Sequence, residues 1–199
     1  MTEVGHLDPR NWHLVFDPFA MGAVVSKLDA YSQRVLSLLC AEKVLPVFLK
    51  RFTSPARQMT SLIDDAWDAL VLHGNTSSPE DLSDAAGKLV PSSMEFPDAG
   101  PAIPAGEALI SALKSAAEPS SQALMEVIGL THTTFEFSVY LRRYGTGELG
   151  TLISGADLHE RMRTVGKEPE LQQLKEFIEN TIHRLNARED PLAIRNSMR

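Results

Sequence analysis

The amino-acid sequence predicts an all-α protein, a compact bundle of about seven or eight helices in a single domain covering residues 1–199. Apolar residues recur at three- and four-residue spacing along most of the chain, which is the period of an amphipathic helix. The alternation of apolar and polar residues between turn signals that is typical of strands is missing. A chain of 199 residues suits one hydrophobic core, because cores grow to roughly 250 residues before they divide.

The N-terminal part of the chain contains signals for two helices. Asp17-Pro18 combines a capping residue with a proline at the first helical position, and predicts a short helix through Val25. A longer helix is expected from about Asp29 to Phe52. Pro46 lies inside it and should kink or divide it, because proline removes one backbone hydrogen bond. Residues 1–28 are thus an N-terminal extension with the first short helix.

The middle of the chain is expected to contain two further helices and a connection. Ser54-Pro55 predicts the start of the first of them, and His73-Gly74 predicts its end. Trp67 lies on its apolar side and is expected to be buried with the core. A short helix from about Ser78 to Leu89 follows. Residues 91–104 contain four prolines and predict an ordered surface connection.

The C-terminal half predicts three long helices. The first starts at about Ile103 and ends at Ala117, where Glu118-Pro119-Ser120 interrupts the pattern. The second carries an apolar stripe as far as Tyr140, and the third runs from about Glu168 to Ala187. Residues 144–155 contain four glycines and are expected to form a loop.

The glycine-rich segment matches the dinucleotide-binding pattern letter for letter, in Gly145-Thr-Gly147-Glu-Leu-Gly150. That chemistry requires a strand before the glycines and a helix that opens at them, so that the helix N-terminus meets the pyrophosphate. Here a helix precedes the glycines and no parallel sheet is predicted. We therefore interpret the segment as an interhelical loop and expect no nucleotide or other cofactor.

Composition and charge indicate which kinds of partner the protein could bind and in which compartment it is expected. The net charge of −7 repels phosphate backbones and argues against a general nucleic-acid binder. Cys40 is the one cysteine, so an internal disulfide is impossible and nothing indicates an oxidising compartment. The N-terminus lacks the pattern of a signal peptide, and no apolar run approaches the ~20 residues that span a membrane. The expected location is the cytoplasm, without membrane attachment.

Six polar residues are the candidates for a functional site: Glu42, Asp64, Asp68, Glu107, His132 and Glu136. A cation site around Asp64, Asp65 and Asp68 is disfavoured, because neighbouring helical positions diverge by ~100°. No histidine or cysteine stands in a zinc-binding motif, and no metal is expected. His132 lies in a polar patch within an apolar helix, which we interpret as a face that meets solvent or a neighbouring backbone.

Three stretches of the chain resemble a known family. They are Leu38 to Pro46, which contains Cys-Ala-Glu-Lys before the proline, Ile63 to Leu70, which contains Asp-Asp-Ala-Trp, and Leu89 to Leu109, a proline-containing acidic connection that enters a helix. They are similar to the corresponding stretches of the YjaG-like family of uncharacterised, all-helical bacterial proteins. Residues 194–197 follow the closing motif of that family in a different order, and residues 1–28 extend beyond it. The resemblance implies a helical fold and transfers no active residue.

The leading functional hypothesis is a non-enzymatic cytosolic protein-interaction or regulatory module, because no nucleophile, base and orienting residue stand out together. Its specific form is an immunity-type protein whose acidic face neutralises a basic partner. The expected partner is another protein or a second copy of the chain. The alternative is a small enzyme with a site assembled between helices from the carboxylates and His132.

Overall fold

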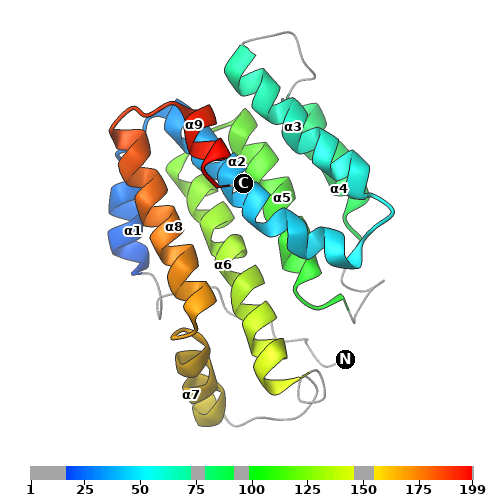
Figure 1. The fold of residues 1–199 in the computed structure, drawn as a ribbon, viewed down its shortest axis with the longest axis vertical. Helices are drawn as coiled ribbons and strands as arrows, with labels where there is room; N and C mark the ends of the chain where they lie inside the picture. The colour runs from blue at the N-terminus through cyan, green and yellow to red at the C-terminus, as the bar shows by residue number, and fades with distance from the viewer. Residues whose placement is uncertain (1–16, 73–78, 92–98, 146–154, 199) are drawn as a thin grey trace.

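The computed structural model describes residues 17–72, 79–91, 99–145 and 155–198, and within these ranges the chain forms nine helices and no strand (Figure 1). Eight helices have eight or more residues and the last has six, which confirms the predicted all-α bundle. The helices are α1 (Pro18–Val25), α2 (Ala30–Arg51), α3 (Ala56–Leu72), α4 (Pro79–Leu89), α5 (Ala102–Ala117), α6 (Ser121–Tyr144), α7 (Gly155–Val165), α8 (Pro169–Asn186) and α9 (Pro191–Asn196).

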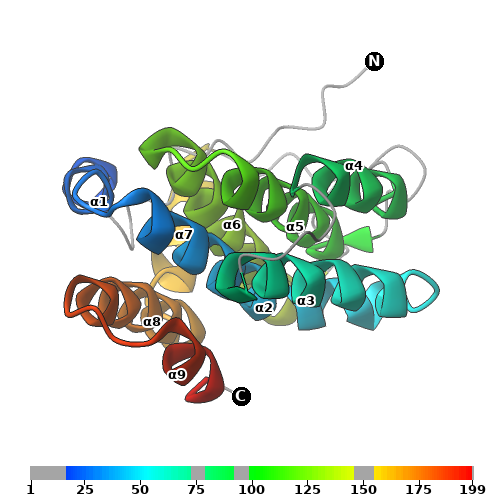
Figure 2. The ribbon, with the colours of Figure 1, turned by 90° about the horizontal axis from the view of Figure 1, so that it is seen from above.

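α2 lies at the centre of the bundle and packs against α5, α6, α3 and α8 (Figure 2). α4 packs on α5 and α3, so that α3 and α4 form a hairpin at one side of the molecule. α8 packs on α6 and α2 at the opposite side, and α1 packs on α6. α9 lies beside α2, between α8 and α3 (Figures 1 and 2).

Capping side chains set the helix starts that the sequence predicts. The carboxylate of Asp17 accepts hydrogen bonds from the backbone N–H groups of Phe19 and Ala20, at 2.9 and 3.2 Å. Asp29 caps α2 in the same way, and Ser120 caps α6. These side chains satisfy backbone donors that have no partner inside the helix, which explains why the starts predicted at Asp17-Pro18 and near Asp29 are correct.

α2 is continuous, so the division expected at Pro46 does not occur. Pro46 is exposed, whereas the core-facing residues of α2 are packed against several other helices. Water can replace the lost backbone bond on the exposed side, and packing on the buried side holds the helix together. The tertiary contacts therefore outweigh the local cost of the proline.

Other boundaries differ from the prediction. α5 begins at Ala102, which places Pro104 in its first turn, where a helical N–H has no partner to lose. The expected connection over residues 91–104 therefore ends earlier than predicted. Residues 92–98 of this connection and residues 146–154 of the glycine-rich segment lie outside the described ranges. α3 begins at Ala56, and neither α7 nor α9 is predicted by the sequence.

The core confirms the predicted burial of Trp67, whose side chain is 1% exposed. Phe48 and Phe52 pack as a tilted pair with ring centroids 5.2 Å apart. The C-terminal end of α6 is tied to the start of α8 by ion pairs of Arg142 with Glu170 and of Arg143 with Glu168. None of the described helices has the length and apolar character needed to cross a membrane.

Gly106 lies where α5 packs closely against Val90 and Phe48. A Cβ atom at this position would lie 2.5 Å from Cγ1 of Val90 and 3.3 Å from a ring carbon of Phe48. Gly129 in α6 provides a matched control, since nothing lies within 4 Å of a Cβ atom built there. Alanine raises helix propensity by roughly 1 kcal/mol at either position, so a difference between the two substitutions reports packing alone.

We predict that Gly106→Ala lowers the free energy of unfolding and that Gly129→Ala raises it. Overpacking typically costs about 1–3 kcal/mol, which exceeds the gain in helix propensity. Urea unfolding of both variants followed by circular dichroism measures the two changes. Shifts in the same direction for both variants would show that Val90 moves aside without cost.

Candidate functional site

Arg195 binds two carboxylates and an aromatic ring that come from other helices. Its Nε donates a hydrogen bond to Oε1 of Glu42 at 2.6 Å, and its Nη2 donates one to Oδ1 of Asp64 at 2.7 Å. Its Cζ atom lies 4.8 Å from the centroid of the Trp67 ring, within the distance of a cation–π interaction. We call this arrangement the arginine site; its walls are Glu42, Asp64 and Trp67.

The walls of the arginine site belong to two long helices, and its occupant belongs to the shortest one. Glu42 lies in the middle of α2, while Asp64 and Trp67 lie one turn apart on α3. α9 begins at Pro191, with Asp190 as its capping residue, and places Arg195 in its last turn. The site therefore joins positions that are 131 and 153 residues apart in the chain.

The electrostatics of the site favour a charged guanidinium. Arg195 is 9% exposed. Burial disfavours its charge, but the hydrogen bonds to Glu42 and Asp64 outweigh burial, and the pKa of Arg195 lies above its ordinary value. The planar fork of a guanidinium can bond two carboxylates and stack on a ring at the same time, which a lysine ammonium cannot do. The site is thus selective for arginine over lysine.

The arginine site lies next to a strongly acidic surface. Asp64, Asp65 and Asp68 occupy the C-terminal half of α3, and Asp81 and Asp84 occupy the N-terminal half of α4. α3 and α4 run side by side in opposite directions, so these five carboxylates share one end of the hairpin (Figure 1). We call it the acidic end. The exposed cations of the two helices, Arg57 and Lys88, lie at the other end.

A second polar group is buried in the core, on α6. Nδ1 of His132 lies 4.0 Å from Oε2 of Glu136, one turn further along the helix. His132 has no exposed surface and Glu136 is 4% exposed. Of the two alternatives expected for the His132 face, contact with solvent is therefore wrong, and contact with a neighbouring backbone stays a prediction. The neighbouring Thr133 and Thr134 donate to the carbonyl groups of Gly129 and Leu130, so the polar patch is partly satisfied by α6 itself.

Burial suppresses charge in this part of the core. It lowers the pKa of His132 to about 4 and raises the pKa of Glu136 to about 7. On the adjacent α2, burial raises the pKa of the Cys40 thiol to about 12, with the side chain of Thr131 and the charge of Lys43 acting against this shift. Cys40 therefore stays a thiol near neutral pH, and a thiol is a poor nucleophile and metal ligand.

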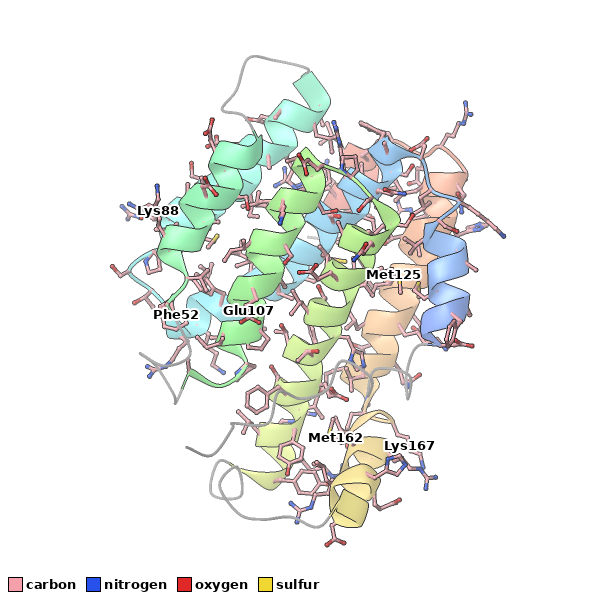
Figure 3. The ribbon with its side chains drawn as sticks, turned by 180° about the vertical axis from the view of Figure 1, so that it is seen from behind. Phe52, Lys88, Glu107, Met125, Met162 and Lys167 are labelled. Atoms are coloured by element: carbon pink, nitrogen blue, oxygen red, sulfur yellow. The ribbon has the colours of Figure 1, made fainter. Side chains whose placement is uncertain are left out.

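The structure thus separates the six candidate residues into three groups. Glu42 and Asp64 meet at Arg195, and His132 and Glu136 meet inside α6. Asp68 and Glu107 are exposed; Asp68 belongs to the acidic end, and Glu107 lies on the first turns of α5, away from α3 (Figure 3). Among the described residues, no group of three or more His, Cys, Asp and Glu side chains could hold a metal ion.

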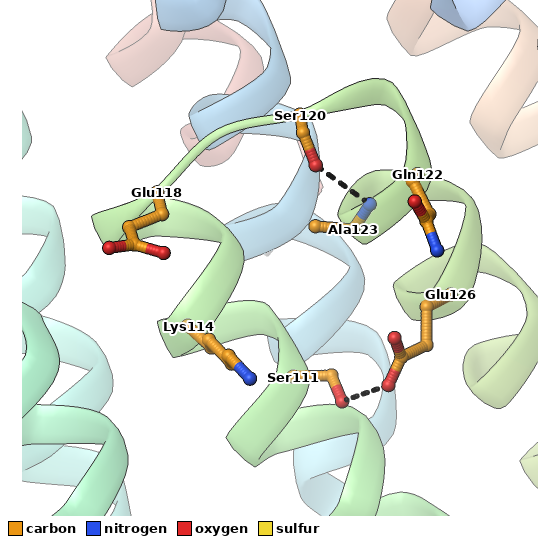
Figure 4. Close-up of a pocket in the computed structure, with 7 residues that line it drawn as sticks. All are labelled: Ser111, Lys114, Glu118, Ser120, Gln122, Ala123 and Glu126. Atoms are coloured by element: carbon orange, nitrogen blue, oxygen red, sulfur yellow. Dashed lines mark hydrogen bonds between the residues drawn. The ribbon is translucent and has the colours of Figure 1, made fainter.

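Two hollows in the described surface contain none of the six candidates. One, of about 210 Å³, lies where α5 turns into α6 and is lined by Lys114, Glu118 and Glu126 among others (Figure 4). The other, of about 120 Å³, lies between α2, α6 and α8 beside Lys43 and Phe177. Both are smaller than the roughly 300 Å³ at which ligand pockets begin.

Arg195 is the member of the arginine site that the sequence does not single out. Asp190-Pro191 repeats the signal that correctly predicts α1 at Asp17-Pro18, a capping residue followed by a proline. That signal was sufficient to predict a helix start at residue 191. The ion pairs of Arg195 had no such signal, because they connect distant parts of the chain.

Comparisons of the chain with protein-family models, with curated proteins and with solved structures find no match. The resemblance to the YjaG-like family therefore stays a prediction. Two of the stretches that carry it, Leu38 to Pro46 and Ile63 to Leu70, lie in α2 and α3. They supply all three walls of the arginine site, so the residues behind the resemblance converge in space.

The buried pair of His132 and Glu136 has opposite effects on stability as the pH falls. Glu136 holds its proton in the folded state up to about pH 7, against 4.5 in an unfolded chain, so its protonation stabilises the fold as the pH falls from 7 to 4.5. His132 stays neutral in the folded state down to about pH 4, against 6.5 when unfolded, so its contribution to stability is lost as the pH falls from 6.5 to 4. The two effects compensate.

We predict that single substitutions uncover each effect. In His132→Gln, the free energy of unfolding should rise as the pH is lowered from 7 to 4.5, relative to the wild type at each pH. In Glu136→Gln, the free energy of unfolding should fall as the pH is lowered from 6.5 to 4. Each change should reach about 3 kcal/mol, because one pKa unit corresponds to about 1.4 kcal/mol. Denaturant unfolding across this range measures the differences, and curves parallel to that of the wild type would contradict the prediction.

Proposed function

We propose that this protein is a non-enzymatic interaction module that binds a basic protein segment, in a regulatory or immunity-type role. The observation that carries the proposal is the arginine site: a guanidinium is held there by Glu42, Asp64 and the ring of Trp67. This combination of two carboxylates and an aromatic face is the chemistry by which proteins recognise arginine side chains. The site adjoins the acidic end of the α3–α4 hairpin, which would attract further cations.

Charge supports a basic partner over a neutral one. The chain carries a net charge of −7, and the acidic end has five carboxylates without an interspersed lysine or arginine on α3 or α4. Such a surface accelerates the encounter with a positively charged partner and repels nucleic acid. We further propose a cytoplasmic location, supported by the single, fully buried thiol of Cys40, and membership of the YjaG-like bacterial family.

The proposal is supported by accessibility as well. Asp68 and Asp84 are exposed, so a partner can reach the acidic end without any rearrangement. His132 and Glu136, by contrast, are buried, so a substrate could not contact them in this conformation. The geometry therefore favours binding at the surface over chemistry at the buried pair.

A peptide titration tests the proposal. A fluorescently labelled peptide of alternating arginine and serine should bind the protein, and a glutamate-serine peptide should not. Affinity and on-rate should fall as the salt concentration rises past 0.15 M, where the screening length is about 8 Å. Fluorescence anisotropy and stopped-flow mixing measure both quantities.

Paired variants locate the binding surface. Asp68→Asn/Asp84→Asn should weaken binding, since it removes two charges from the acidic end. Glu118→Gln/Glu176→Gln is the matched control, because it removes two exposed charges from α5–α6 and α8 instead. Equal losses for both double variants, or no saturable binding of the arginine peptide, would refute the proposed function.

A further inference from the structure

We infer that Arg195 is a displaceable, autoinhibitory occupant of the arginine site, and that an arginine of the basic partner replaces it when the partner binds. The inference rests on the proposed function and adds the chemical identity of the recognised side chain and a means of regulation. It starts from the observation that the walls of the site come from α2 and α3, whereas the occupant comes from α9.

The walls belong to helices that also pack on other parts of the bundle. Trp67 is held in the core at 1% exposure, and Glu42 lies on the central helix of the bundle. The indole N–H of Trp67 is buried and has no hydrogen-bond partner among the described residues, so packing and the contact with Arg195 hold the ring. If α9 left, the site would keep two carboxylates beside an aromatic face, a shape and charge that fit a guanidinium from another chain.

α9 itself is attached through few side chains. Of its six residues, only Ile194 and Arg195 are buried, and Leu192 is 36% exposed. The turn that leads into it contains Arg188 with φ of 58°, a left-handed conformation that residues other than glycine adopt at a cost. Leaving the site therefore requires the loss of buried Ile194, the partly buried Met198 and the hydrogen bond from Arg184 to Ser197, and the exchange of one set of ion pairs for another.

The short tether makes α9 a strong competitor for its own site. A segment joined by a short linker has an effective concentration on the order of millimolar. A single arginine from a partner cannot compete at lower concentration unless its segment makes further contacts. The acidic end supplies them: Asp68 and Asp84 are exposed and Asp65 is partly exposed, so other cations of the same segment can reach these carboxylates. The occupant that fits is therefore a basic segment with an arginine among several cations.

Autoinhibition and a purely structural clamp predict different affinities. The apparent affinity of an occupied site is reduced by the fraction of molecules in which the site is vacant. If the site is vacant in at most about a tenth of the wild-type molecules, the apparent affinity is reduced tenfold or more. Removal of Arg195 should then tighten binding of the arginine peptide by the same factor. A structural clamp predicts lower stability with no gain in affinity.

The experiment compares full-length variants with the same labelled arginine-serine peptide. Arg195→Ala should bind it about tenfold more tightly than the wild type, and a lysine-serine peptide should gain much less. Lys43→Ala is the matched control for charge, because Lys43 neighbours Glu42 in the chain but stacks on Phe177, outside the site. Adding Glu42→Gln to Arg195→Ala should abolish the gain.

Hydrogen exchange keeps the test decisive even if Arg195→Ala folds poorly. In the wild-type protein, a saturating amount of the arginine peptide should accelerate amide exchange in residues 191–196, because α9 is displaced. The inference would be overturned by unchanged exchange in residues 191–196, or by equal affinities of Arg195→Ala and Lys43→Ala for the peptide. The proposed function would still stand in that case, provided that the wild-type protein binds the peptide through the acidic end. Absence of binding to every variant would overturn both.

Discussion

The burial of α2 on every side is the constraint on which the rest of the bundle depends. Residues 35–41 have no exposed surface, so two full turns of the helix face protein in all directions. A helix with apolar residues all round must be covered all round, and α5, α6, α3 and α8 provide that cover. Even Ser37 obeys this constraint, since its hydroxyl bonds the carbonyl of Gln33 at 2.9 Å and the hydroxyl of Ser115 at 2.8 Å.

The same constraint explains the character of the two polar groups. Glu42 lies just beyond the fully covered turns of α2, at the edge of the core, and can be reached by Arg195. Its side chain is 14% exposed, so its charge is partly desolvated and is stabilised by a direct partner. His132 and Glu136 lie inside the core on α6, and there burial shifts the pKa of each side chain toward its neutral form. The arginine site at the edge of the core thus holds charged side chains, whereas the buried pair of His132 and Glu136 is shifted toward neutral side chains.

The sequence predicts the local features of this fold well and the long-range ones poorly. Asp17, Asp29 and Ser120 specify helix starts because a cap acts within three residues, and Trp67 is buried as its spacing indicates. α7 was missed although Leu158, Met162 and Val165 have helical spacing, because the helix is short and mostly polar. The pairing of Glu42 and Asp64 through Arg195 joins residues over 130 positions apart, and no local pattern encodes it.

The order in which the chain is made has a consequence for the arginine site. The synthesis of α2 and α3 is complete more than 120 residues before Arg195 is added. At about 5–20 residues per second, this interval lasts roughly 6–25 seconds, which is long compared with the folding of a helical hairpin. During that time Glu42, Asp64 and Trp67 exist without their intramolecular arginine. The arginine site is thus completed only at the end of synthesis, after α5, α6 and α8 have been added around α2.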